Sequence, residues 1–139
     1  MPGTKSQRFS KHVFDRVQHR IAEFSDEGTR LRKYKSLCKR AGGNLRVMGL
    51  TQFLTFLAAR GQRASEVHHH DLLEDLRLSC GYLGLPTAGD RLKYLATVRE
   101  LQLPQYMRLT REVLRLLEWH KRLSDIMIEG TVDEHAEEE

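Results

Sequence analysis

Apolar positions along the chain recur at helical spacing throughout. In residues 6–25, 29–41 and 104–128 they fall three or four positions apart, so that each segment has one apolar side and one polar side. Clusters of β-branched residues are rare, while Leu, Arg and Glu, which favour helices, are abundant. The pattern predicts an all-α fold, a compact bundle of about six helices with a long C-terminal helix.

Glycine and proline mark where the predicted helices end and begin. The first helix covers residues 6–25, and the second covers residues 29–41 and stops at the pair Gly42 and Gly43. The third covers residues 45–60 and ends before Gly61. Because it is apolar on nearly all sides, we expect it to be the central helix of the bundle.

Capping residues predict the starts of the last three helices. Ser65 is the expected N-cap of the fourth helix, and Thr87, with Asp90 three residues further on, is expected to begin the fifth. Pro104 suits the first turn of the sixth, which we expect to run to Ile128.

Helical periodicity also predicts which side chains form the core. All five phenylalanines occupy core-facing positions, as do Val47 in the third helix and Leu92 in the fifth. The two cysteines, Cys38 and Cys80, lack CxxC spacing and are expected to be buried free thiols in a reducing compartment.

The length of 139 residues suits a single domain, which we expect over residues 1–129. Residues 130–139 are acidic and poor in apolar side chains, and are therefore predicted to form a disordered tail. No apolar run approaches the length of a bilayer span, so we expect a cytoplasmic protein without a membrane partner.

Charge is divided unevenly between the two halves of the chain. Residues 1–63 hold fourteen Lys and Arg against four Asp and Glu, a net charge of +10, whereas residues 64–139 hold nine against fifteen, a net charge of −6. The overall charge of +4 hides this asymmetry. A strongly basic half predicts a polyanion or an acidic protein as partner.

The basic half supplies the candidate RNA-binding residues. Arg32, Lys35 and Lys39 share one helical ridge, a spacing that suits successive phosphates, although a merely solvated charged face is the alternative. With the phenylalanines expected in the core, contact with the RNA backbone is favoured over base stacking. The complete set of candidates is Arg8, Lys11, Arg16, Arg32, Lys33, Lys35, Lys39, Arg40 and Arg46.

A second cationic stripe lies on the sixth predicted helix, and it includes the single tryptophan. Arginine beside tryptophan is common at the centre of protein interfaces, so this stripe is a candidate subunit interface. The alternative is a structural tryptophan half covered by arginine stems. The residues of the stripe are Arg108, Arg111, Arg115, Trp119 and Arg122.

The histidines are candidates for metal ligands and for catalytic groups. Consecutive residues 68–70 point about 100° apart on a helix and cannot chelate together, so we expect no metal or other cofactor, and His69 is expected to pack in the core or an interface. His12 and His19 amid arginines suggest a metal-independent ribonuclease, but seven residues of helix separate them by about 10 Å. The sequence therefore favours a binding protein over an enzyme.

Two segments resemble a known family. YKSLCKRAGGNLRVMGLTQFLTFLAARG (residues 34–61) and YMRLTREVLRLLEWHKRLSDIM (residues 106–127) closely resemble the small subunit of type III-B (Cmr) CRISPR effector complexes, and the likeness extends over residues 7–128. In the first segment Gly42 and Gly43 stand where relatives have a less flexible turn. The residues that match the family signatures are Gly49, Leu50, Gln52, Leu54, Phe56, Leu57, Leu116, Leu117, Trp119 and Arg122.

The resemblance implies a non-catalytic subunit that stacks in several copies inside an RNA-guided complex. Its implied partners are the backbone and large subunits, neighbouring copies of itself, the CRISPR RNA and the target RNA. A chain with one positive and one negative half independently suits head-to-tail stacking. The small helical subunit of the type III-A complex remains an alternative, as does the less favoured ribonuclease.

Overall fold

The computed structural model describes residues 3–130, and every regular element in this range is helical. The all-α prediction with a long last helix is therefore confirmed. The tail predicted for residues 130–139 lies outside the described residues, apart from Gly130. The elements are α1 (Lys5–Glu23), α2 (Gly28–Met48), α3 (Leu50–Arg60), the short 3₁₀ helix η1 (Ala64–Glu66), α4 (His68–Tyr82), α5 (Arg91–Arg99) and α6 (Leu103–Met127).

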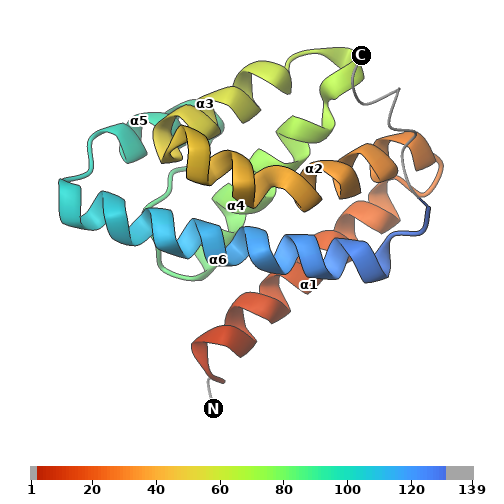
Figure 1. Cartoon of the computed structure of the whole chain (residues 1–139), viewed down its shortest axis with the longest axis horizontal. Coiled ribbons are helices and arrows are strands. Elements are labelled where there is room, and N and C mark those ends of the chain that lie inside the picture. The colour runs from red at the N-terminus through yellow and green to blue at the C-terminus, as the bar shows by residue number, and fades with distance from the viewer. Residues whose placement is uncertain (1–2, 131–139) are drawn as a thin grey trace.

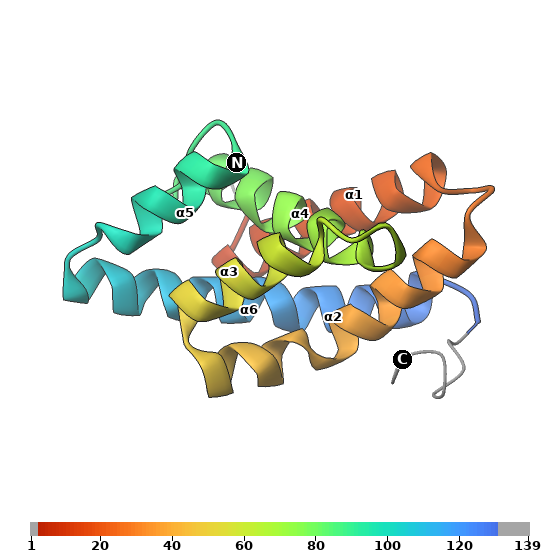
Figure 2. The ribbon, with the colours of Figure 1, turned by 90° about the horizontal axis from the view of Figure 1, so that it is seen from above.

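The longest helix, α6, runs along the length of the molecule, and the other helices are arranged around it (Figure 1). Helices α1 and α2 each pack against α6, and both also contact α4. Helices α3 and α5 contact each other, and α3 packs on α4. Figure 2 shows α1 and α2 diverging from the turn that joins them.

Local sequence signals explain several helix ends. Thr4 and Gln7 form a reciprocal capping box at the start of α1, and Pro104 lies in the first turn of α6 as predicted. The predicted caps of the fourth and fifth helices were wrong. Ser65 lies within η1, and the N-cap of α5 is Asp90, whose side chain accepts a hydrogen bond from the Lys93 amide.

The predicted break at Gly42 and Gly43 was also wrong, because α2 continues through both glycines to Met48. Ala41 and Leu45, on either side of the pair, are buried in the core, and their burial offsets the helix propensity that two glycines lose, about 1 kcal/mol each. The chain turns instead at Gly49, whose φ of 82° lies in the region that favours glycine. Residues 45–48 therefore belong to α2 and not to the third helix.

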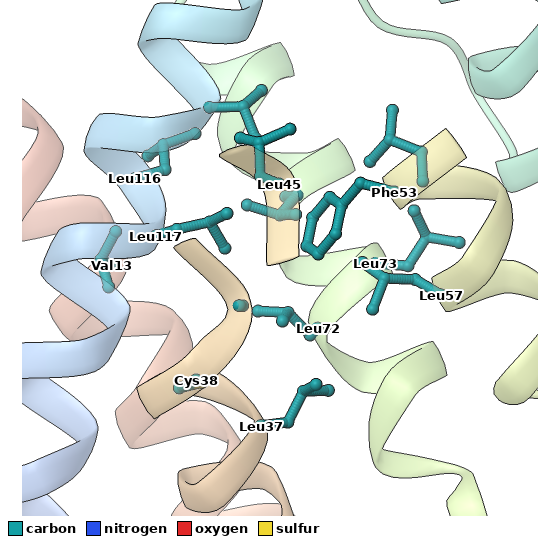
Figure 3. Close-up of a cluster of buried hydrophobic side chains, with 14 of the residues drawn as sticks. Val13, Leu37, Cys38, Leu45, Phe53, Leu57, Leu72, Leu73, Leu116 and Leu117 are labelled. Atoms are coloured by element: carbon teal, nitrogen blue, oxygen red, sulfur yellow. The ribbon is translucent and has the colours of Figure 1, made fainter. Parts of the chain in front are cut away.

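The core lies where α2, α3, α4 and α6 meet (Figure 3). Figure 3 shows Leu45, Phe53, Leu72 and Leu117 pointing into one cluster, and all four are buried. Helix α3 contributes the buried residues Leu50, Phe53, Leu54, Leu57 and Ala58, which agrees with its predicted central place.

Three of the predicted core residues are exposed. Val47 is 89% exposed because it lies on the outer side of α2 once the helix continues past Gly43. Leu92 on α5 is 67% exposed, and Phe14 on α1 is 41% exposed. For both residues, periodicity identified an apolar position. It could not show that this part of the helix is left uncovered by the other helices.

Both cysteines are free and buried, as predicted. Burial raises the pKa of the Cys38 thiol, and it raises the pKa of the Cys80 thiol to about 11. Both thiols are therefore protonated near neutral pH. Within residues 3–130, no helix is long and apolar enough to cross a membrane.

Candidate nucleic-acid interface

A cluster of buried polar side chains joins α1, α2 and α4. Asp75 of α4 is fully buried, and its carboxylate accepts hydrogen bonds from Arg16 at 2.9 Å, from Arg20 at 3.1 Å and from the hydroxyl of Tyr34. A buried carboxylate is costly unless it is paired and fully hydrogen-bonded. The three donors therefore fix Asp75 and hold the helices that carry them in one arrangement.

Asp71, one turn before Asp75, extends this cluster to the start of α2. Its carboxylate accepts two hydrogen bonds from Arg30, at 2.8 and 2.9 Å, and its backbone carbonyl accepts one from Arg20 at 3.1 Å. The Arg30 guanidinium also lies 3.7 Å from the centre of the Phe24 ring. These contacts hold the turn between α1 and α2 against α4.

His120 extends the same cluster to α6. Its Nδ1 lies 3.3 Å from the Tyr34 hydroxyl, whereas its Nε2 is buried without a hydrogen-bond partner among the described residues. Burial lowers the pKa of His120 to about 4, so the ring is neutral near pH 7. None of these roles was predicted, although Asp71 and Asp75, four positions apart beside buried leucines, were a signal for buried acids.

The cations predicted on α2 divide into two groups. Lys33 donates a hydrogen bond to the Ser65 carbonyl, and Lys35 donates to the carbonyls of Ile128 and Gly130 just after α6. The ammonium of Lys35 thus satisfies carbonyls that follow the last turn of α6. Both lysines help to hold α2 against other parts of the fold.

The second group on α2 consists of Arg32, Lys39, Arg40 and Arg46, and all of these except Arg32 are exposed. Arg32, which is half-buried, donates a hydrogen bond to the hydroxyl of Thr29. Arg40 donates to the hydroxyl of Ser36, one turn before it. Near the end of the helix, Arg46 forms an exposed ion pair with Glu118 at 3.3 Å. Arg32 and Lys39 are therefore the cations of α2 whose predicted role the geometry suits best; we call them the α2 cations.

The predicted cations of α1 do not adjoin the α2 cations. Arg8 and Lys11 are exposed on the N-terminal half of α1, which projects beyond α6 on the side away from α2 (Figure 1). Arg16 instead turns inward to its ion pair with Asp75, where it stabilises the fold. The candidate surface is therefore two separate basic regions.

The predicted interface stripe on α6 is largely exposed. Arg108, Arg111, Arg115 and Arg122 are all exposed, and the guanidinium of Arg122 lies 5.5 Å from the centre of the Trp119 ring. Trp119 is half-buried and packs against the core, so it also has a structural role. The exposed arginines leave one side of α6 available to a partner.

The histidines do not form a common site. His12 shares a hydrogen bond of 2.8 Å with Ser79, whereas His19 pairs with Glu23 at 3.2 Å on its own helix. His69 is buried against Phe56, which confirms that it is a packed residue. Among residues 3–130, no three side chains of His, Cys, Asp or Glu gather as metal ligands would.

A cavity of about 360 Å³ opens between the turn before α2 and the start of α4. Its lining balances the carboxylates of Asp26 and Glu27 against Arg30 and Lys33. Because Arg30 is already held by Asp71, the cavity offers little net positive charge to a phosphate. We therefore place the candidate interface on the exposed cations and not in this cavity.

The described residues therefore define a small, all-helical protein with exposed arginines and lysines on α1, α2 and α6. The family model described as CRISPR-associated protein (Cas_Cmr5) matches residues 5–127. The CRISPR system Cmr subunit Cmr5 of Thermus thermophilus is 32% identical over 126 residues, covering 91% of this chain and 97% of that protein.

A solved structure shows the same family relationship. The X-ray crystal structure of a CRISPR-associated Cmr5 family protein from Thermus thermophilus superposes with a TM-score of 0.73 at 30% identity, and the match covers 91% of this chain and all of that one. The chain therefore belongs to the Cmr5 family of CRISPR-associated proteins. This confirms the resemblance to the type III-B small subunit and disfavours the type III-A alternative.

Proposed function

We propose that this chain is a non-catalytic subunit of a Cmr effector complex and contacts the backbone of the target RNA, or of the guide–target duplex. The observation that carries the proposal is the family match over residues 5–127, since the Thermus relative is a Cmr subunit. The chain would then assemble with other Cmr subunits in antiviral defence. The exposed cations supply the chemistry for the RNA contact.

The α2 cations suit a phosphate backbone. Arg32 and Lys39 are seven positions apart, so they lie on the same side of α2 about 10 Å from each other along its axis. Cations spaced in this way neutralise phosphates without contacting base edges. Contacts to phosphates carry no sequence information. Binding through this surface should therefore be independent of sequence and strongly dependent on salt.

Self-association is the second part of the proposal. The stripe Arg108, Arg111, Arg115 and Arg122 with Trp119 would dock on an acidic surface of the next copy or of a backbone subunit. A head-to-tail contact uses two different surfaces on each copy. The stripe would supply a local cationic surface within residues 64–139, and the acidic residues of this half would supply the complementary one. Docking of this kind should weaken as salt increases.

Charge reversal of the α2 cations tests the RNA contact. The double change Arg32→Glu and Lys39→Glu should weaken RNA binding by the full chain about equally for different sequences, and should lower the salt slope of log K by about one for each cation removed. Lys35 is left unchanged because it bonds to the end of α6. The matched control is Lys93→Glu with Arg99→Glu, the same charge change on exposed residues of α5.

Equal effects of the two double changes would show only a response to net charge and would contradict a contact on α2. For self-association, sedimentation of the full chain at low and high salt is the measurement. A monomer at every salt concentration, together with separated copies in an assembled complex, would contradict stacking.

A further inference from the structure

Two rings from different helices form a stacked pair on the outside of the molecule. His12 of α1 and Tyr82, the last residue of α4, have ring centres 4.4 Å apart and planes inclined by 28°. Tyr82 is 56% exposed although His12 covers one of its faces, so the residue remains accessible to a ligand. Leu78, one turn before Tyr82, is also exposed and extends the apolar surface.

A buried residue of α4 holds the ring pair in position. Nδ1 of His12 shares a hydrogen bond of 2.8 Å with Oγ of Ser79, which is fully buried. Burial, followed by the nearby charge of Arg16, lowers the pKa of His12, so its imidazole is neutral near pH 7. A ring pair that is already ordered loses little conformational entropy when a ligand binds to it.

Cations flank the pair because α1 and α4 run antiparallel. Arg20 bonds to Asp71, Arg16 to Asp75 and His12 to Ser79, so each step of four residues on one helix is matched by four on the other. The next step along α1 reaches Arg8, beside the end of α4 that carries Tyr82. Arg8 and Lys11 are both exposed. Asp15, four residues after Lys11, is the acidic residue of α1 on the same side of the helix.

We propose that the Tyr82–His12 pair is a stacking platform for one unpaired RNA base, whose neighbouring phosphates are bound by Arg8 and Lys11. An exposed aromatic face beside two cations matches the two parts of a nucleotide, its base and its phosphate. A base within a duplex is already stacked on its neighbours, so the platform selects single-stranded RNA. The inference rests on the proposed RNA contact and adds a second, separate region to it.

Affinity measurements on the full chain test the platform. Tyr82→Ala should weaken binding of a single-stranded oligoadenylate by about tenfold, whereas Tyr82→Phe, which keeps the ring, should bind within about twofold of the unsubstituted chain. Affinity for an RNA duplex of the same length should not change. The control is Leu92→Ala, which removes an exposed apolar side chain from α5, outside the proposed platform. Thermal unfolding checks that each variant is folded.

Photocrosslinking in a reconstituted Cmr complex locates the base. Target RNA that contains 4-thiouridine should crosslink to the peptide carrying Tyr82, and Tyr82→Ala should abolish that crosslink. If Tyr82→Ala binds single strands as the unsubstituted chain does, while reversal of Arg32 and Lys39 weakens binding, the platform is wrong and the proposed function stands. If no RNA binds or crosslinks to this subunit, both are wrong.

Discussion

The hydroxyl of Tyr34 on α2 donates a hydrogen bond to the carboxylate of Asp75 on α4, and both side chains are fully buried. Burial, together with the charge of Asp75, raises the pKa of Tyr34 well above its ordinary value, so the phenol remains protonated and acts as donor. This contact joins residues 41 positions apart and links the helix of the α2 cations to the rest of the bundle.

Replacing Tyr34 by Phe should lower the free energy of unfolding by about 1–3 kcal/mol, because a buried carboxylate oxygen loses its hydrogen bond. Denaturant unfolding measures the loss. Tyr94→Phe is the matched control, since the Tyr94 hydroxyl is equally buried but has only a 3.5 Å contact with the sulfur of Cys80. Its loss should be smaller, and equal losses would contradict the importance of the bond to Asp75.

Replacing Asp75 by Asn should cost more, about 3–5 kcal/mol, because Arg16 and Arg20 would lose the carboxylate that neutralises them. Asp125→Asn on the exposed side of α6 makes the same chemical change and should stay within about 0.5 kcal/mol of the unsubstituted protein. Chemical denaturation of both variants gives the comparison. A loss at Asp75 as small as that at Asp125 would show that the cluster does not hold α1 to α4.

The error at Gly42 and Gly43 shows where sequence patterns fail. Two adjacent glycines are a strong local signal for a break, yet Gly42 and Gly43 are inside α2, and the single Gly49 ends it. The helix continues because Ala41 and Leu45 are buried against residues distant in the chain. Local helix propensity does not include the free energy of this burial. The helices themselves were predictable because amphipathic periodicity is local.

Alanine at the two kinds of glycine should therefore have opposite effects. Gly43→Ala should raise the free energy of unfolding by about 0.5–1 kcal/mol, because the residue is inside a helix and an added Cβ meets no atom within 4 Å beyond the neighbouring helix backbone. Gly49→Ala should lower it by about 1–3 kcal/mol, because its φ of 82° and ψ of 161° are strained for any residue with a Cβ. Thermal or denaturant unfolding of the two variants measures both changes in stability. A destabilising Gly43→Ala would argue against a continuous α2.

Acid should destabilise the protein through His120. Its pKa is about 4 in the folded protein and about 6.5 when unfolded, so above pH 6.5 neither state binds the proton and stability is unaffected. Below pH 6.5 the unfolded state binds it first, and stability falls as the pH is lowered towards 4, by about 2 kcal/mol at pH 5.

Unfolding titrations at pH 7 and pH 5 measure this effect of His120. His120→Gln should show a smaller difference between the two pH values, with a remainder from His68, whose pKa burial lowers to about 3. The same pH dependence in His120→Gln and in the unsubstituted protein would contradict the assignment.

The sequence by itself determined the helical class, most helix positions and the family, because helical periodicity, capping and the motif residues are all local features of the chain. Only the tertiary structure decided which cations are available to a ligand. Arg16 and Lys35 look like Lys39 in the sequence, but Asp75 and the end of α6 hold the first two, while the third is exposed. The stacking of His12 on Tyr82 was equally undetermined, since it depends on how α1 packs on α4. The physical reason is that burial and pairing are set by partners distant in the chain, and only folding brings those partners together.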